Sequence, residues 1–329
     1  MKALIVKSTL TPVDISIVVP TFNRPEGLKN ALESLSIQSV EGRTLEIIVA
    51  DNAPDGNARA YVETFAEQCP IDLHYIHVPD PGVANARNEA LEKAQGDYLA
   101  FLDDDQIATP NWLATLFEKA QHFNATLVFC PTYAQSQLDI RYKAEFLEFF
   151  TRDIHKQGST LVDEFFGCGN SLLDRRKIAL PSPPFCPSTN ETGGEDDLLF
   201  SYLQNQGGRI VWTNDTNALE DVDDRRMTKR YIKQRSFAYG QGPSRLCAAP
   251  ENFNLLGLFK WSIIGALQFA VYWPLSVLTH LFRSHRSIWF MRKAAEGAGK
   301  VLWFESFRPK LYGKAWLKFS GITKSTPIQ

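Results

Sequence analysis

Three consecutive acids follow an apolar run in the first third of the chain. The run from Tyr98 to Leu102 has the length and the β-favouring content of a buried strand, and Asp103, Asp104 and Asp105 come directly after it. Neighbouring carboxylates repel one another, and hard oxygen ligands suit Mg²⁺ or Mn²⁺, so we interpret the segment as a metal site at a strand end. A solvated acidic turn that caps the next helix is the alternative that these residues alone leave open.

A second acidic group, formed by Glu195, Asp196 and Asp197, stands before the helical pattern LLFSYLQNQ. Acids at the start of a helix often only complement the helix dipole, and that interpretation stays open for this segment. The flexible pair Gly193 and Gly194 lies directly before the acids, which favours a site that a loop can reshape. We therefore treat the segment as a candidate catalytic site.

Polar residues also follow the first two predicted strands. Thr21 and Asn23 follow the apolar run ISIVVP, and Asp51 and Asn52 follow the run LEIIVA. Ligands of open α/β sheets lie just beyond the carboxyl ends of the strands, so these residues and the first acidic group are predicted to line one nucleotide pocket. A carboxylate placed like Asp51 can accept hydrogen bonds from a base or a ribose.

The segment 79–96 begins as a Pro/Gly turn and becomes a helix near Val83. Its loop near Gly82 is predicted to be mobile and could close over a phosphate, whose charge Arg87 could pair with. An ordinary cation on a helix surface is the alternative interpretation of Arg87.

Strand and helix patterns alternate through the first 130 residues. Apolar runs predict strands at 15–20, 45–50, 73–78, 98–102 and 126–130. Helices are predicted between them; Pro25 opens the first, and Thr109 and Pro110 are the expected N-cap and first residue of the fourth. This order predicts an α/β fold with a doubly wound, mostly parallel sheet and right-handed connections.

The chain after residue 130 is less regular. Residues 142–157 are predicted to be helical, 209–213 to form a strand, and 218–242 to form a basic helix. The arginines and lysines of that helix either hold phosphates of an anionic substrate or form a solvated face. Gly167 and Gly169 would let the main chain approach a ligand closely before a short strand.

The composition limits the classes of protein to consider. The 329 residues are 44% hydrophobic, which suits one large domain or two smaller ones, and the formal charge of −2 does not suggest a nucleic-acid partner. The five cysteines form no CxxC pair, so we expect neither a disulfide framework nor a zinc site, and a reducing cytosol fits best. The N-terminal apolar run is too short for a secretory signal and suits a short strand or a loose lead-in.

The C-terminal region is apolar and then basic. Residues 255–273 are long enough to span a bilayer, although Lys260 and Gln268 interrupt them and Pro274 is expected to break or kink the helix. Basic residues then dominate, with aromatic residues between them: Arg283, Arg286, Arg292, Lys293, Lys300, Arg308, Lys310, Lys314 and Lys318. We expect helices that lie on or dip into an anionic cytoplasmic leaflet. A single spanning helix and a helical subdomain packed on the core are the alternatives.

The order and spacing of seven motifs carry a family resemblance. They are IVVPTFNRPEGL, IIVADNAPDG, PGVANARNEAL, YLAFLDDD, FGCGNSLLDRR, GGEDDLLF and ALEDVDDRRMT. From Ile15 to Gly242 the chain resembles family 2 glycosyltransferases of the GT-A fold, especially bacterial ones that build exopolysaccharides. The resemblance implies a GT-A catalytic domain over residues 1–250 and leaves 251–329 as a helical, membrane-associated region.

The resemblance also implies roles for particular residues. The nucleotide pocket would be lined by Pro20, Thr21, Asn23 and Asp51, with Arg87 and Asn88 nearby, and Asp103, Asp104 and Asp105 match the DXD motif. Asp105 would bind the metal, and Asp103 would contact the nucleotide sugar or support the metal. Asp196 matches the catalytic base, and Glu195 stands beside it for acceptor binding. Some members supply a metal-binding histidine after the last strand, where this chain has Glu220 and Asp221.

The implied activity is inverting, Mg²⁺- or Mn²⁺-dependent transfer from a nucleotide sugar, with a UDP-sugar preferred. The acceptor would be a saccharide or a lipid-linked saccharide in cell-surface polysaccharide synthesis, at the cytoplasmic face of the inner membrane, with the protein peripheral or single-pass. A nucleotidyltransferase and a non-catalytic sugar-binding subunit of a membrane assembly are the alternatives. The intact acidic motifs and the GGEDD segment favour sugar transfer.

Overall fold

The computed structural model describes residues 12–249 and 253–309, which form two compact units. Among the described residues, the first unit contains 12–132 and 152–219, and the second contains 133–151, 220–249 and 253–309. The domain boundary predicted at residue 250 lies outside the described residues and stays a prediction.

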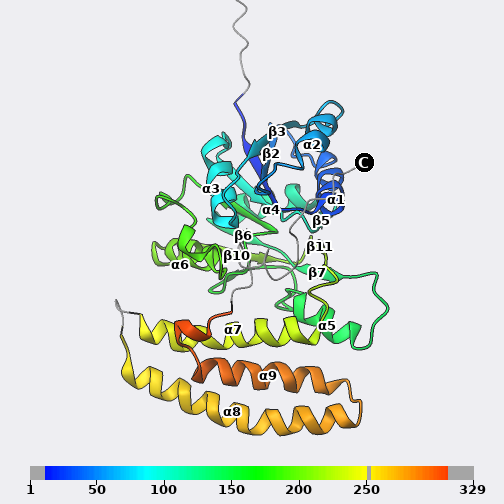
Figure 1. Cartoon of the computed structure of the whole chain (residues 1–329). Coiled ribbons are helices and arrows are strands. Elements are labelled where there is room, and N and C mark those ends of the chain that lie inside the picture. Colours follow the sequence, from blue (N-terminus) through cyan, green and yellow to red (C-terminus); the bar gives the residue numbers. More distant parts are fainter. Residues whose placement is uncertain (1–11, 250–252, 310–329) are drawn as a thin grey trace, which may run out of the picture. The chain divides into compact units, whose positions relative to one another are not determined.

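An eight-stranded sheet forms the centre of the first unit, in the order β3-β2-β1-β4-β9-β6-β10-β8. The strand β1 (Ile15–Thr21) lies between β2 (Leu45–Asp51) and β4 (Tyr98–Phe101) and is parallel to both, and β3 (Asp72–His77) is parallel to β2. These four strands confirm the predicted ones to within a residue or two at each end. Figure 1 labels β2 and β3, which lie in the blue, N-terminal part of the chain.

The other half of the sheet is mixed. β9 (Ser171–Asp174) is antiparallel to both β4 and β6 (Leu127–Phe129), and β10 (Ile210–Thr213) pairs parallel with β6 and antiparallel with β8 (Ser159–Val162). Four of these seven pairings are therefore parallel. The doubly wound α/β prediction is confirmed, with antiparallel insertions where the regular alternation of the sequence ends.

Helices cover both faces of the sheet because the buried strands are apolar on both sides. In β1, Ile17 and Val19 belong to one apolar cluster, together with residues of α1 (Pro25–Ser36), α2 (Arg59–Ala66) and α4 (Trp112–His122). Val18, between them, belongs to the opposite cluster, together with residues of α3 (Val83–Lys93) and α6 (Glu195–Asn205). The alternation along one strand thus separates two cores.

Two predicted helices differ in their bounds from those of the structure. Helix α4 begins at Trp112 after Asn111, because the hydroxyl of Thr109 hydrogen-bonds instead with the carbonyl of Asn217 at 2.8 Å. The helix predicted over 142–157 is only α5 (Lys143–Phe150), since the next residues include a bridge between Thr132 and Arg152.

The predicted basic helix begins later than expected. Residues Ala218–Asp221 form strand β11 of a three-stranded sheet with β5 (Gln106–Ala108) and β7 (Thr132–Gln135). Their main-chain groups therefore form the hydrogen bonds of a sheet and not those of a helix. Helix α7 (Lys229–Ala248) starts only after Thr228, whose side chain accepts a hydrogen bond from the N–H of Tyr231.

Three long helices dominate the second unit. Helix α9 (Arg286–Val301) packs between α7 and α8 (Leu255–Leu281), as Figure 1 shows. Glycines allow this close packing: a Cβ on Gly299 would lie 2.1 Å from the carbonyl oxygen of Phe237, and one on Gly297 would lie 2.8 Å from that of Gly265. Short 3₁₀ turns occur at Pro187–Thr189 and Glu305–Phe307.

The apolar C-terminal helix is confirmed as one uninterrupted element. Helix α8 has 27 residues and continues through Pro274, so the predicted break there is wrong. Among the described residues it is the one helix whose length and apolar composition would suffice to cross a membrane. The basic residues Lys310, Lys314 and Lys318 lie outside the described residues.

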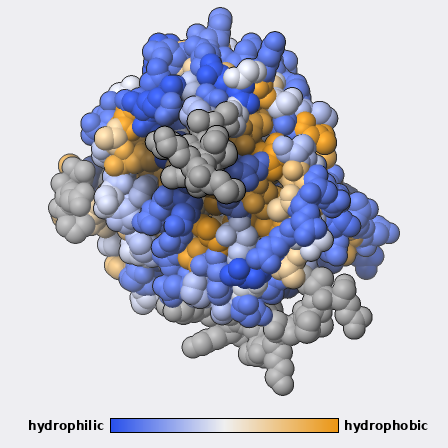
Figure 2. Space-filling view, turned by 90° about the horizontal axis from the view of Figure 1, so that it is seen from above, coloured by the Kyte–Doolittle hydropathy of each residue, from blue (hydrophilic) through white to orange (hydrophobic). Residues whose placement is uncertain are grey.

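Exposed apolar side chains are distributed unevenly between the units. In the described part of the chain, only three large hydrophobic side chains of the first unit are exposed: Ile37, Leu161 and Leu198. The face seen from above in Figure 2 is accordingly mostly hydrophilic, with hydrophobic residues gathered in smaller patches. The other exposed large hydrophobic residues belong to the second unit, and most of them lie on α8.

Helix α1 packs very closely on the acidic loop after β4, which gives a test of the fold. A Cβ on Gly27 would lie 2.5 Å from the carbonyl oxygen of Asp104. Replacing a helical glycine by alanine alone stabilises by roughly 0.5–1 kcal/mol, whereas we expect Gly27→Ala to destabilise by about 1–3 kcal/mol through overpacking. Urea unfolding measures this. The exposed neighbour Lys29 gives the control, and an unchanged midpoint in both Gly27→Ala and Lys29→Ala would contradict the packing described.

Candidate active site

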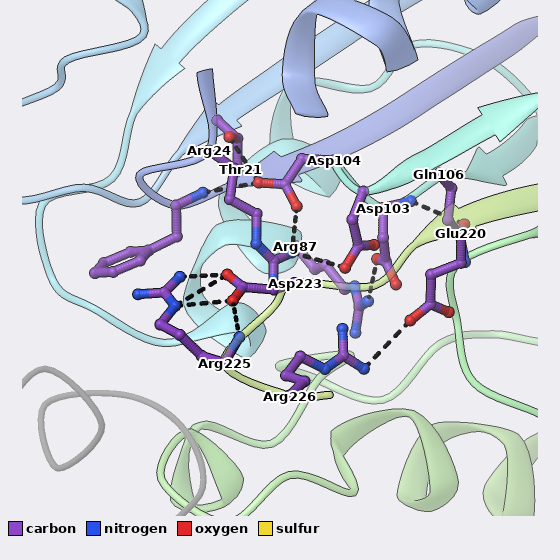
Figure 3. Close-up of polar contacts among 12 residues, drawn as sticks. Thr21, Arg24, Arg87, Asp103, Asp104, Gln106, Glu220, Asp223, Arg225 and Arg226 are labelled. Carbon is purple, nitrogen blue, oxygen red and sulfur yellow. Dashed lines mark hydrogen bonds and ion pairs between the residues drawn. The ribbon is translucent and has the colours of Figure 1, made fainter. Parts of the chain in front are cut away.

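The site forms where the parallel strands β1 and β4 end side by side. Because these strands are neighbours, the loop after Thr21 meets the loop after Phe101, although the two are some 80 residues apart in the sequence. The hydroxyl of Thr21 donates to Asp104 Oδ2 at 2.9 Å (Figure 3). The main-chain N–H of Phe22 donates to the same oxygen at 3.2 Å. Two of the predicted polar residues therefore meet at one sheet edge.

Arg24 offsets two of the three neighbouring carboxylates. Its Nη1 donates to Asp104 Oδ1 at 2.7 Å (Figure 3). The same nitrogen donates to Asp105 Oδ2 at 2.9 Å. Burial raises the pKa of Asp104, and the charge of Asp105 adds to this, while Arg24 acts in the opposite direction. The sequence interpretation gave Arg24 no role; its position at the end of the strand next to β4 was the signal that would have identified it.

Arg87 connects the first acidic group to the second. Arg87 is 4% exposed, and its guanidinium donates from Nη2 to Asp103 Oδ1 at 2.9 Å and from Nη1 to Glu195 Oε1 at 2.6 Å. The ring of Phe185 lies 5.5 Å from the guanidinium carbon. The interpretation of Arg87 as a helix-surface cation is wrong. Figure 3 shows this side chain reaching toward Asp103.

Glu195 and Asp196 lie side by side in the first turn of α6 but in different surroundings. Glu195 is 5% exposed and paired with Arg87. Burial, with the neighbouring charge of Asp196, raises the pKa of Glu195 to about 7, although Arg87 partly offsets the shift. Asp196 is only partly buried and accepts hydrogen bonds from the main-chain N–H groups of Cys168 at 3.1 Å and Asp197 at 2.9 Å.

The glycine-rich segment before β9 packs against both acidic groups. A Cβ on Gly169 would lie 2.3 Å from Asp103 Oδ2, and one on Gly167 would lie 3.5 Å from Asp196 Oδ2. Asn170, with φ of 73°, anchors the segment through its buried side chain, which accepts from Trp112 Nε1 at 2.7 Å and donates to the carbonyl of Pro131 at 2.8 Å. The close main-chain approach predicted for the glycines is thus made to the acids.

The residues expected to line the nucleotide pocket are largely engaged within the protein. Asp51 is fully buried and accepts from the N–H groups of Ala53 and Ala58 and from the hydroxyl of Tyr75. Pro20 is buried within β1, and Asn23, in the left-handed region with φ of 51°, accepts from the amide of Asn57. The structure brings these residues to the same sheet edge as the acids, and their contacts with a nucleotide stay predictions.

The loop around Gly82 is held in place by asparagines. Asn52 accepts from the Gly82 N–H at 2.6 Å and donates to the carbonyls of Val78 and Asp80. Gly82 has φ of 152°, and a Cβ there would lie 2.1 Å from Asn190. These contacts do not support the predicted mobility of the loop.

Asn88 has a structural partner in the proline-rich segment. Its amide exchanges two hydrogen bonds with the main chain of Phe185, at 2.8 and 2.9 Å. Both ends of the amide are therefore engaged, which places the ring of Phe185 over Arg87. The predicted contact of Asn88 with the nucleotide has no support from this geometry.

The carboxylate oxygens of the first acidic group suit a hard cation whose remaining ligands come from the substrate. Asp103 and Asp105 present oxygen atoms, and in the described part of the chain no group of three or more His, Cys, Asp or Glu side chains is arranged around a metal position. Mg²⁺ and similar cations are commonly held by one or two carboxylates together with substrate phosphates, so two aspartates fit such a site. Both are paired with arginines, which would have to move aside or turn to the phosphates.

The position where some relatives supply a histidine is occupied by an ion pair within the second unit. Glu220 is buried and lies 3.2 Å from Arg226, while Asp221 accepts from the Gln135 amide at 2.8 Å (Figure 3 shows the first pair). The guanidinium of Arg226 also lies 4.8 Å from the ring of Phe150. Both acids thus have protein partners.

Comparison with known proteins gives consistent matches. The profile described as Glycosyl transferase family 2 matches residues 16–179. The "Succinoglycan biosynthesis protein ExoM" of Rhizobium meliloti (strain 1021) is 34% identical over 236 residues, which are 71% of this chain and 75% of that protein. The "GalNAc(5)-diNAcBac-PP-undecaprenol beta-1,3-glucosyltransferase" of Campylobacter jejuni is 32% identical over 107 residues, 32% of this chain and 34% of that protein.

Solved structures share the fold at lower identity. The mannosyltransferase PcManGT from Pyrobaculum calidifontis, in complex with GDP-Man and Mn²⁺, has a TM-score of 0.58 at 18% identity, covering 89% of this chain and 88% of its own. TarS 1-349 of S. aureus, in complex with UDP-GlcNAc, has a TM-score of 0.51 at 16% identity, covering 88% and 90%. These similarities support the GT-A architecture.

The buried Glu195 gives a test of the site through pH. With its folded-state pKa raised from 4.5 to about 7, the folded state keeps a proton that the unfolded state loses, so stability falls as the pH rises between these values. Glutamine does not titrate, so Glu195→Gln removes this pH dependence of stability. As the pH rises from 4.5 to about 7, the wild type should lose on the order of 2–3 kcal/mol of unfolding free energy relative to the variant. Urea unfolding on both sides of the interval measures it. If the unfolding free energies of the wild type and the variant change in parallel with pH, the carboxylate of Glu195 is ionised throughout this interval.

Proposed function

Because the chain belongs to glycosyl transferase family 2, we propose that this glycosyltransferase moves a sugar from a nucleotide sugar to a saccharide hydroxyl with inversion. The observation that carries the proposal is the contact of Arg87 with both Asp103 and Glu195. It brings together a candidate donor-binding group at the end of β4 and a candidate acceptor-activating group at the start of α6. Family membership favours this chemistry over nucleotidyl transfer, and the intact acids favour catalysis over a binding-only role.

On the donor side, Asp105 and Asp103 would hold Mg²⁺ or Mn²⁺ together with the donor diphosphate. The bound cation would supply Lewis-acid stabilisation of the charge that grows on the leaving diphosphate. Arg24, released from Asp105, and Arg87 would offer guanidinium groups to the phosphates. The presence of Mn²⁺ and GDP-Man in one structural neighbour and UDP-GlcNAc in another supports this assignment, and we propose a UDP-sugar as the donor.

On the acceptor side, Asp196 would act as the general base. It is the more exposed of the two acids, and its Oδ2 is positioned by the Cys168 N–H, whereas Glu195 is buried against Arg87. Asp196 takes the proton of the acceptor hydroxyl as that oxygen forms a bond to the anomeric carbon, and the bond to the nucleoside diphosphate breaks on the opposite face. Glu195 would hold Arg87 in place rather than contact the acceptor directly.

We infer the acceptor and the location from the relatives. ExoM is named for succinoglycan biosynthesis and the Campylobacter relative for a lipid-linked saccharide, which supports cell-surface polysaccharide synthesis on a saccharide or lipid-linked saccharide. Such an acceptor would be met at the cytoplasmic face of the inner membrane. The exposed apolar helix α8 supports membrane association of the chain.

Asp196→Asn tests the base. The variant keeps the shape and one of the two main-chain hydrogen bonds, because an amide has a single acceptor oxygen, and it cannot accept the proton. We therefore expect kcat to fall by about 10²–10⁴ while the donor affinity stays near normal. Release of nucleoside diphosphate with a suitable acceptor gives the rate, and calorimetric titration with UDP gives the affinity. Asp197→Asn, at the exposed next residue, is the control and should retain turnover. Retained turnover in Asp196→Asn, or loss of UDP binding, would contradict the role.

A screen of nucleotide sugars tests the donor site. Saturating donor with Mn²⁺ should raise the unfolding midpoint, since a ligand at 100 times its Kd stabilises by about 2.7 kcal/mol. Chelation with EDTA should remove most of that increase, and Asp105→Asn should abolish its dependence on Mn²⁺. Thermal unfolding of the wild type and the variant, with and without EDTA, measures both effects. Equal stabilisation with and without Mn²⁺ would exclude the proposed cation site.

A further inference from the structure

Helix α8 carries most of its large apolar side chains on its exposed side and several polar side chains on its packed side. Leu256, Phe259, Ile263 and Leu267 are between 44% and 83% exposed, and the exposed stripe continues at helical spacing through Val271, Pro274, Leu278 and Leu281. The polar side chains Ser262, Gln268, Ser276 and Thr279 are all partly buried. This polarity is the reverse of that of a helix on the surface of a water-soluble protein, so the exposed stripe needs an apolar partner.

The packed side of α8 is tied to a charged helix. Gln268, the middle residue of α8, donates from its amide to the carbonyl of Lys293 at 2.8 Å and accepts from Lys300 Nζ at 3.0 Å. Lys293 also pairs with Glu296 at 2.9 Å, and Gly265 and Gly297 bring the two backbones into contact. The centre of α8 therefore lies against the ionised groups of α9.

These contacts oppose a transmembrane position for α8. At about 1.5 Å per residue its 27 residues span about 40 Å, which is enough to cross a hydrocarbon layer of about 30 Å. Crossing would place Gln268 near the middle of the bilayer and bring Lys293, Glu296 and Lys300 with it, at a high cost for each charge. The alternative, separation of α8 from α9, would break the glycine contact and both hydrogen bonds of Gln268.

The charge of the region matches an anionic lipid surface. Residues 253–309 contain seven Lys or Arg and two Glu, a formal charge of +5, although the whole chain carries −2. Lys260, Arg283 and Arg286 are exposed on or next to α8. Trp273 and Trp289 are also exposed, and tryptophan is enriched at the level of lipid headgroups.

We propose that α8 lies in the plane of an anionic membrane surface. Its exposed apolar stripe enters the boundary between headgroups and acyl chains, and α9 stays on the aqueous side. Both ends of α8 are then on the cytoplasmic side. The inference rests on the membrane association in the proposed function and specifies its geometry.

Cysteine accessibility in cells tests this geometry. Single cysteines replace Phe253, before α8, and Ser284, after it, in the full-length chain whose partly exposed Cys69, Cys186 and Cys247 have been changed to serine. A membrane-impermeant maleimide should label both positions in inside-out vesicles and neither in intact cells. Labelling of the two positions from opposite sides would overturn the proposal. Sugar transfer measured on the same membranes reports separately on the proposed function.

Vesicle binding tests the apolar stripe. The purified chain should bind vesicles of phosphatidylcholine with phosphatidylglycerol more tightly than vesicles of phosphatidylcholine alone. Leu267→Glu should lower the partition coefficient by about tenfold or more, because a charge replaces a leucine in the apolar boundary. Ile37→Glu, at an exposed position of the first unit, should leave it unchanged. If the wild type binds no vesicles and Leu267→Glu instead converts a dimer to a monomer, a second copy covers the stripe and the proposal is wrong.

Discussion

The pairing of one buried guanidinium with two acids holds the candidate site together. A charge as buried as that of Arg87 is tolerated only with close ionic partners, and its partners Asp103 and Glu195 come from the end of β4 and the start of α6. The proline-rich segment adds the ring of Phe185, positioned by Asn88. Removing Arg87 would leave Glu195 buried beside Asp196 without a cation, so the arrangement of both acidic groups depends on this side chain.

The order of the strands decides which residues surround that pairing. Because β1 lies beside β4, Thr21 and Arg24 meet Asp104 and Asp105, and because β9 is inserted next to β4, the glycine-rich segment packs on Asp103 and Asp196. Three adjacent carboxylates are thereby offset by two arginines within the protein. A cation that binds with the diphosphate would exchange these internal ion pairs for contacts with the substrate, so donor binding and local rearrangement would be coupled.

The second unit shows a different balance of forces. Its helices approach one another through glycines and carry polar groups between them, while apolar side chains of α8 face outward. Burial of apolar surface against water stabilises the first unit, in whose described part only three large hydrophobic side chains are exposed. For α8 the same effect favours contact with lipid. A chain that is attached in this way would remain at the surface where lipid-linked saccharides are found.

The sequence alone determined the parallel strands of the first unit and the helices between them, the two acidic groups, the family resemblance and the apolar C-terminal helix. These features depend on local periodicity and on motifs whose residues are contiguous. It did not reveal the partners of Asp105, the burial of Arg87, the raised pKa of Glu195, the antiparallel strands or the outward-facing polarity of α8. Each of these arises between residues far apart in the chain, such as Arg87 and Glu195 or Gln268 and Lys293, and only the packing of strands and helices decides which of them meet.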